Sequence, residues 1–317
     1  MVSTDRFEFV KKNSPLYLQA RADNLKIMSL DRFSRTTSLL LIATISLAMA
    51  GTVSAEEIID PSVEYKDDVL GLITFFLFFV GYISMGAAFV FFMAERNSVA
   101  PQYRTTMTIS ALIVGIAAFH YYYMRGVYTD LGSVSIEYRY MDWIITVPLM
   151  ALKFPSLVGK DAITDEKFLG MGFTGVCFSG ALIMIGFGYL GESGALGEAL
   201  DDAALGGWLG LILGGVGWAM IIVATGTPWS SGKGVNNDNI ADELLWSANA
   251  LRWFIVVGWI IYPLGYLFSP EVAIIDIGEK GELYMGIAYN IADMINKIGF
   301  GVVAWMGAKK ASEALEA

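Results

Sequence analysis

Seven apolar segments, separated by short polar stretches, occupy most of the chain. Each approaches or exceeds the roughly 20 residues that a helix needs to cross the hydrocarbon core of a bilayer. We place these segments at residues 69–94, 105–125, 136–153, 166–190, 205–225, 245–268 and 283–307. The stretches between them are too short to hold a separate domain. The pattern therefore predicts an all-α membrane protein, folded as a seven-transmembrane helix bundle.

An earlier apolar run, residues 38–50, has a different setting. Arg32 and Arg35 precede it and small residues up to Ala55 follow it, which is typical of a secretory signal peptide. An additional N-terminal span is the alternative, but the run is short for one. We therefore expect an N-terminal extension with a cleaved signal peptide over residues 1–55. A seven-helix domain over 56–310 and a short cytoplasmic tail over 311–317 complete the chain.

The charged residues between the segments predict an orientation. Basic residues gather in the loops after the first, third and fifth segments and in the tail, at Arg96, Arg104, Lys160, Lys167, Lys233, Lys309 and Lys310. Acidic residues gather at the other ends, at Glu56, Glu57, Asp60, Glu64, Asp67, Asp68, Glu192, Glu198, Asp201, Asp202, Glu271, Asp276, Glu279 and Glu282. The positive-inside rule then places the C-terminus in the cytoplasm and the mature N-terminus outside.

Composition agrees with a membrane protein and excludes some kinds of site. The 317 residues are 55% hydrophobic and 16% charged, which is too apolar for an ordinary soluble domain. The net charge of −10 comes without a basic block, so we expect no nucleic-acid partner. A single histidine, His120, leaves no histidine cluster for a metal. The one cysteine, Cys177, lies in an apolar run and is expected to serve packing.

Ionisable residues occur inside two of the apolar segments. Asp293 and Lys297 are four residues apart, so they share one face of a helix. Arg139, Asp142 and Thr146 form a similar polar stripe on the third segment. A charge inside a membrane costs about 2.5–3.5 kcal/mol on insertion scales and usually marks function. A buried ion pair that only stabilises packing is the alternative, but two turns of ionisable residues exceed what packing needs.

Aromatic residues on the sixth segment suggest a ligand. Trp259, Tyr262 and Tyr266 recur at helical spacing, which by itself is common in a packed core. Facing a buried lysine, they would wall a slot for a long apolar ligand. A buried lysine is also the kind of amine that forms a Schiff base with an aldehyde.

These residues belong to longer runs that together are specific. The runs are Arg139-Tyr140-Met141-Asp142-Trp143 with Thr146-Val147-Pro148-Leu149, Gly258-Trp259-Ile260-Ile261-Tyr262-Pro263, Tyr289-Asn290 with Ala292-Asp293 and Asn296-Lys297, His120-Tyr121-Tyr122-Tyr123-Met124-Arg125-Gly126, and Gly186-Phe187-Gly188-Tyr189-Leu190-Gly191-Glu192. On these runs, over residues 65–310, the chain resembles the microbial (type 1) rhodopsins, and among them most the proteorhodopsins.

The resemblance implies a cofactor and roles for the polar residues. All-trans retinal would be bound covalently to Lys297 as a protonated Schiff base. Asp142 matches the primary counterion and proton acceptor, Asp293 the second counterion, and Arg139 the arginine on the exit side. The matching retinal-pocket positions, one of which (Met150) tunes colour, are Trp143, Thr146, Met150, Met184, Gly188, Trp259, Tyr262 and Pro263.

Two further positions leave alternatives open. His120 matches a histidine that family members pair with the acceptor, whereas a lone core histidine would be the ordinary interpretation. Lys153 stands where proteorhodopsins usually carry a carboxylic acid that reloads the Schiff base from the cytoplasm. A few pumps of the family carry lysine there, so Lys153 is a candidate proton donor. The alternative is that it snorkels to the cytoplasmic surface.

The resemblance also implies partners. Beside membrane lipid, we expect a homo-oligomer, a pentamer or hexamer. Phe79 replaces the tryptophan that touches the histidine across subunits in family oligomers, which puts that contact in doubt. Some relatives dock a carotenoid antenna at a glycine-lined opening on the fifth segment. Close helix packing is the favoured explanation for the glycines here.

The favoured function is a light-driven outward proton pump, an ion transporter rather than an enzyme. The third segment runs inward, so Lys153 lies about 16 Å further toward the cytoplasm than Asp142, at 1.5 Å per residue. By the resemblance, the acid at Asp142 and the neutral Thr146 argue against sodium or chloride pumping. A slow-cycling photosensor that signals to a partner protein is the alternative, although only a short tail follows Lys310. We expect a multi-pass protein of the inner (plasma) membrane of a prokaryote.

Overall fold

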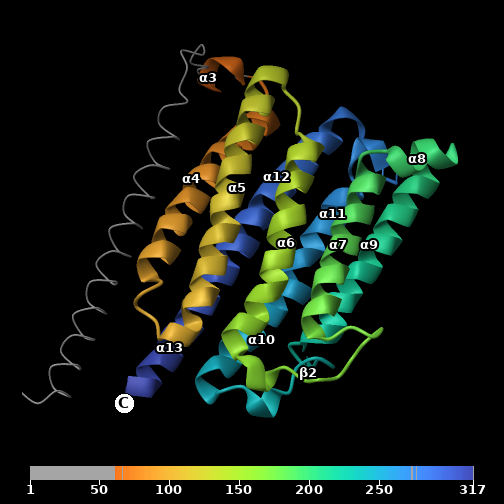
Figure 1. Cartoon of the computed structure of the whole chain (residues 1–317). Coiled ribbons are helices and arrows are strands. Elements are labelled where there is room, and N and C mark those ends of the chain that lie inside the picture. Colours follow the sequence, from red (N-terminus) through yellow and green to blue (C-terminus); the bar gives the residue numbers. More distant parts are fainter. Residues whose placement is uncertain (1–60, 66, 273, 276, 317) are drawn as a thin grey trace, which may run out of the picture. The chain divides into compact units, whose positions relative to one another are not determined.

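Long helices aligned side by side make up the described part of the chain (Figure 1). The computed structural model describes residues 61–65, 67–272, 274–275 and 277–316. The N-terminal extension, with the predicted signal peptide and its cleavage after Ala55, lies outside the described residues. The same holds for Glu56, Glu57, Asp60 and Asp276 of the predicted acidic face.

Five membrane-length helices are regular. They are α4 (Val69–Glu95), α5 (Arg104–Leu131), α6 (Ile136–Val158), α7 (Phe173–Glu192) and α9 (Ala203–Thr225). The sixth helix comprises α10 (Asp242–Val256), the 3₁₀ turn η4 (Gly258–Ile260) and α11 (Ile261–Tyr266). The seventh comprises α12 (Gly281–Asp293), the π-helix η7 (Met294–Gly299) and α13 (Phe300–Glu316). Within the described residues, the first six of these are long and apolar enough to cross a membrane, and the π-helix interrupts the seventh.

Short elements cover the two ends of the bundle. The helices α3 (Pro61–Glu64) and α8 (Ala195–Leu200) lie at one end. At the other end, where α13 also finishes, β1 (Gly226–Thr227) pairs antiparallel with β2 (Ser230–Ser231) (Figure 1). The 3₁₀ turns are η1 (Pro101–Tyr103), η2 (Lys160–Ala162), η3 (Asn237–Asn239), η5 (Pro270–Val272) and η6 (Gly278–Lys280).

The segments are confirmed, but some predicted ends are wrong. We expected the fourth segment to begin at residue 166, whereas α7 begins at Phe173. Leu169 and Gly170 have φ angles of 53° and 77°, so the chain turns there instead of continuing as a helix. The second helix is longer than predicted and ends only at Gly132, a left-handed cap with φ 70°. The predicted tail continues α13 to Glu316.

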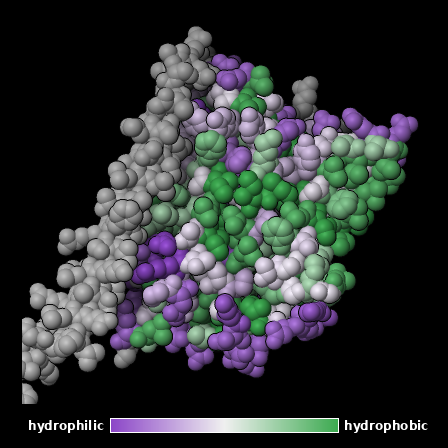
Figure 2. All heavy atoms as spheres, viewed as in Figure 1, coloured by the Kyte–Doolittle hydropathy of each residue, from purple (hydrophilic) through white to green (hydrophobic). Residues whose placement is uncertain are grey.

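The surface agrees with a membrane environment. Figure 2 shows apolar residues across the middle of the visible face and hydrophilic residues toward both ends. Large apolar side chains such as Phe76, Phe119 and Ile212 are more than half exposed. Apolar residues facing outward in this way lie against lipid in a membrane protein.

Glycines allow α7 and α9 to approach closely. A Cβ added to Gly180 would meet the main-chain oxygen of Gly217 at 2.7 Å, and one added to Gly210 would meet Cα of Gly191 at 2.7 Å. Backbone atoms cannot yield as side-chain ends can, so these glycines are needed for packing. This is the explanation favoured above for the glycines of the fifth segment.

Candidate functional site

A buried lysine between two carboxylates forms the centre of the bundle. The amine of Lys297, in η7, forms ion pairs with Asp142 of α6 and with Asp293 Oδ2, the second at 2.9 Å. All three side chains are at most 1% exposed. The structure thus brings together the charged residues that the sequence placed on two separate helices.

The two carboxylates differ in the hydrogen bonds that they accept. Asp293 accepts hydrogen bonds from Tyr121 Oη at 3.0 Å, Tyr262 Oη at 2.8 Å and Trp143 Nε1 at 3.2 Å. Asp142 Oδ1 has no hydrogen-bond partner among the described residues. Because donors stabilise a carboxylate, Asp293 is suited to remain charged, whereas Asp142 has an oxygen free to take a proton.

The lysine lies in an irregular part of its helix. Residues Met294–Gly299 adopt π-helical backbone, which is rare and frequently found at functional sites. The sixth helix is irregular beside it, with the 3₁₀ turn Gly258–Ile260. Pro263 explains that turn, since its ring lacks the N–H that would bond to Trp259 and clashes with that carbonyl.

An apolar cavity ends at the lysine. Its volume is about 310 Å³, at the small end of the range for ligand sites. Seven predicted pocket residues line it, namely Trp143, Met150, Met184, Gly188, Trp259, Tyr262 and Pro263. The eighth, Thr146, is buried but not part of the lining, and its hydroxyl donates to the main-chain oxygen of Asp142 at 3.0 Å.

Sequence reasoning missed part of the lining. The residues not predicted are Tyr140, Val147, Ile185, Gly210, Leu211, Gly214, Gly215, Trp218 and Tyr289, whereas Tyr266, expected to wall the slot, does line it. Tyr140, Val147 and Tyr289 belong to motif runs, so their position in those runs was an available signal. For the part of the wall that α9 contributes, only its glycines could have indicated a cavity. An added Cβ at Gly215 would meet nothing within 4 Å, which leaves room for a ligand on that side.

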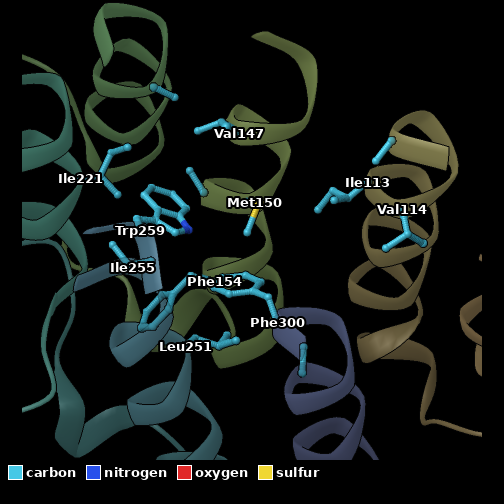
Figure 3. Close-up of a cluster of buried hydrophobic side chains, with 14 of the residues drawn as sticks. Ile113, Val114, Val147, Met150, Phe154, Ile221, Leu251, Ile255, Trp259 and Phe300 are labelled. Carbon is cyan, nitrogen blue, oxygen red and sulfur yellow. The ribbon is translucent and has the colours of Figure 1, made fainter. Parts of the chain in front are cut away.

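The cavity fits the cofactor that the sequence implies. Its walls are apolar and aromatic, and its only amine is that of Lys297. A long apolar aldehyde such as retinal could be held along these walls and attached at that amine. On one side the cavity ends in packed core, where Phe154, Leu251 and Phe300 lie below Met150 and Trp259 in Figure 3.

A second polar group lies between α6, α7 and α12. Arg139 is 1% exposed, donates to Asn290 Oδ1 at 3.2 Å and lies over the ring of Tyr289 at 4.8 Å. Glu192, also 1% exposed, accepts from Tyr140 Oη at 2.5 Å. Sequence reasoning treated Glu192 as part of the acidic outer face, although it ends a motif run, and so missed that it is buried.

Several atoms in and beside this group have spare hydrogen-bonding capacity. Within the described residues, Arg139 Nε and Nη1, Asn290 Nδ2, Glu192 Oε1 and Asp142 Oδ1 are buried without a partner. Buried polar atoms of this kind usually bind ordered water. Asp142 and Glu192 thus each have one buried carboxylate oxygen that can accept a further hydrogen bond.

His120 lies on α5, and its ring makes a polar contact within its own helix. Its ring is half-buried, and Nδ1 lies 3.0 Å from the main-chain oxygen of Ile116. No hydrogen bond joins its side chain to that of Asp142 in the part of the chain described. Its predicted pairing with the acceptor stays a prediction.

Lys153 is fully buried. Its exposure is 0%, its amine has no hydrogen-bond partner among the residues described, and it lies 4.9 Å from the ring centre of Phe300. The alternative that it snorkels to the surface is therefore wrong for this structure. The structure thus places Lys153 inside the bundle, with its amine beside an aromatic ring.

Comparison with known proteins identifies relatives over nearly the whole described part. The model of the bacteriorhodopsin-like protein family matches residues 72–311. A blue-light absorbing proteorhodopsin of Gamma-proteobacterium Hot 75m4 is 35% identical over 278 residues, 86% of this chain and 98% of the relative.

Two solved structures show a similar fold. The rhodopsin of Exiguobacterium sibiricum is 34% identical with a TM-score of 0.63, covering 77% of this chain and 99% of that one. Xanthorhodopsin, described as a light-driven ion pump with a dual chromophore, is 25% identical with a TM-score of 0.64, covering 78% and 97%. The predicted seven-helix architecture is confirmed.

Proposed function

Because the chain belongs to the bacteriorhodopsin-like family of microbial rhodopsins, we propose that it is a light-driven outward proton pump. All-trans retinal would be bound at Lys297 as a protonated Schiff base. The family implies a retinal chromophore. The description of xanthorhodopsin as a light-driven ion pump supports the transport function.

One observation carries the proposal. The Lys297 amine lies at the end of an apolar cavity and contacts two carboxylates, of which Asp293 alone has further side-chain donors among the described residues. A pump needs one anion that keeps its charge and one that can take a proton. The asymmetric contacts of Asp293 and Asp142 support this division of roles.

The residues around the amine define what each would do. Bound retinal would supply light absorption and the change of shape that moves the positive charge relative to Asp142. Asp142 would accept the proton, and Asp293 would keep its negative charge through Tyr121, Tyr262 and Trp143. Proton transfer is favoured when donor and acceptor are already in contact.

The two sides of the centre would serve release and reloading. On the release side, Arg139 and Glu192 would provide polar groups through which the proton leaves toward the outside. On the other side, Lys153 would return a proton to the Lys297 nitrogen and then take one from the cytoplasm. His120 would pair with Asp142, as the family resemblance implies.

Illuminated cells test the proposal. Cells that express the chain with retinal should acidify the medium in light, and a protonophore should abolish the change. A visible chromophore without any change of external pH would contradict pumping. The variant Lys297→Ala should lose the chromophore, which tests the attachment separately.

A further inference from the structure

Asn296 is a buried polar residue that the proposed mechanism does not use. It is 1% exposed and immediately precedes Lys297 in η7. Its Nδ2 donates to the main-chain oxygen of Gly258 at 3.0 Å, while its Oδ1 has no partner among the described residues. The side chain therefore forms a bond between the seventh helix and the sixth.

This bond joins the irregular segments of both helices. Gly258 begins the 3₁₀ turn η4, and Asn296 lies within the π-helix η7. Such segments often mark hinges, because their hydrogen bonds are weaker than those of regular α-helix. A side-chain bond between two such segments is placed where it can control their relative movement.

The bond is also the last polar link between these helices on the Lys153 side. In the described part of the chain, the other side-chain hydrogen bonds from the sixth helix to the seventh are Tyr262 to Asp293 and Tyr289 to the Tyr262 oxygen. Both lie on the Asp293 side of Gly258. Beyond Asn296, the helices are held by packing, such as the Phe254 ring against Phe300 at 5.9 Å.

The same packing lies against Lys153. The Lys153 amine lies over the Phe300 ring, and Phe300 contacts Phe254 of the sixth helix. Phe254 is also 3.0 Å from where a Cβ on Gly299 would lie, so the aromatic contact is tight. Phe300 follows Lys297 by three residues and contacts the Lys153 amine, so its ring lies beside the way from one nitrogen to the other, and its contact with Phe254 would loosen if the two helices separated.

We propose that Asn296 is a positioning residue that latches the sixth and seventh helices between Lys297 and Lys153. Release of its bond to Gly258 limits the return of a proton to the Lys297 nitrogen. In that step Lys153 loses a proton, the Lys297 nitrogen gains it, and the neutral Lys153 amine then takes one from cytoplasmic water. This inference rests on the proposed function.

Two variants each break the bond between Asn296 and Gly258, one by changing the donor residue and one by changing the acceptor residue. Asn296→Ala deletes the donor. Gly258→Ala places a methyl group against Asn296 Oδ1, so the amide must turn away. Each should speed the decay of the deprotonated intermediate in flash photolysis by about five-fold, the ratio that one buried hydrogen bond is worth. The control Ser247→Ala removes a hydroxyl at the same interface that bonds only within its own helix, to Leu244, and should leave the decay unchanged.

Combining Asn296→Ala with Lys153→Ala distinguishes control of access from Lys153 from a general loosening of the helices. If the latch controls access from Lys153, Asn296→Ala should speed decay only when Lys153 is present, because coupled residues are not additive. An equal effect in both backgrounds, or decay within two-fold of the parent in both latch variants, would overturn the proposal.

Amide hydrogen exchange in the dark tests whether Asn296 holds the two helices together, independently of the photocycle. Exchange over residues 253–261, followed by mass spectrometry, should be faster in Asn296→Ala than in the parent and in Ser247→Ala. Unchanged exchange would overturn the latch. A parent protein that never deprotonates in light would contradict the proposed function instead, and exchange would still decide whether Asn296 holds the helices together.

Discussion

At the scale of single residues, the two carboxylates beside Lys297 are distinguished by their neighbours and not by their distance to the amine. Both contact it, but three side chains from α5, α6 and α11 donate to Asp293 alone. From the motif runs it could be inferred that tyrosine and tryptophan side chains lie near the two carboxylates. The sequence could not show that their donors converge on one carboxylate, because this depends on three helices.

The first prediction concerns Asp142. Asp142→Asn should keep a chromophore but reduce light-driven acidification by at least about ten-fold, because the amide cannot take the proton. External pH under illumination, normalised to pigment, measures this. Asp130→Asn, an exposed change on α5, is the control and should pump like the parent. Undiminished acidification by Asp142→Asn would contradict the role of acceptor.

The second prediction concerns Lys153. Lys153→Ala should slow reprotonation by about ten-fold or more at neutral pH, since a positioned acid or base contributes at least this much. In the parent, the step should slow as pH rises, because a lysine donates only while protonated. Flash photolysis across pH measures both, and Lys153→Glu should restore part of the rate. An unchanged decay in Lys153→Ala would rule out the donor role.

At the scale of helices, hydropathy predicted which segments are helical more reliably than where they end. The predicted start at 166 was wrong because Phe168, Leu169 and Met171 are apolar yet form a turn that ends in Gly172. The 3₁₀ turn at Gly258 in the sixth helix follows from Pro263, whereas nothing in the residue pattern predicts the π-helix around Lys297. The cavity wall from α9 was missed because a cavity depends on which faces meet.

The third prediction tests the contact between α7 and α9. Gly217→Ala would bring its Cβ against the main-chain oxygen of Gly180 and the main-chain nitrogen of Met184. Overpacking of this kind costs about 1–3 kcal/mol, so the thermal midpoint in detergent should fall by several degrees. Gly186→Ala, where a Cβ would meet nothing within 4 Å, should leave it unchanged. Equal midpoints for both variants would mean that the helices can separate freely.

At the scale of the whole molecule, the proposed direction of pumping depends on how the chain crosses the membrane. The fold places Arg139 and Glu192 on one side of Lys297 and Lys153 on the other, so the residues proposed for release and reloading are separated by the lysine. Hydrophilic residues lie toward both ends of the visible face (Figure 2), and the signs of the loop charges are what favour one orientation. The direction of pumping is therefore a separate proposal from the proton-transfer roles of the residues.

The fourth prediction tests this orientation. Asp130 precedes α6 and Asp161 comes after it, both side chains are exposed, and the native Cys177 is fully buried. In intact cells, a membrane-impermeant maleimide should label Asp130→Cys but label Asp161→Cys only after lysis. The reverse pattern would mean that the proposed exit faces the cytoplasm.

The π-helix at Lys297 has a consequence for how the chain can change in length. A π-turn holds one residue more than an α-turn of similar rise, so losing one residue from Met294–Gly299 would restore α-geometry. The helices α12 and α13 would then keep facing their present neighbours. The same deletion inside α12 would rotate the remainder of the seventh helix by about 100°. The segment that could lose a residue without turning α12 or α13 is thus the one that carries the lysine, and a loss before Lys297 would also change its spacing from Asp293.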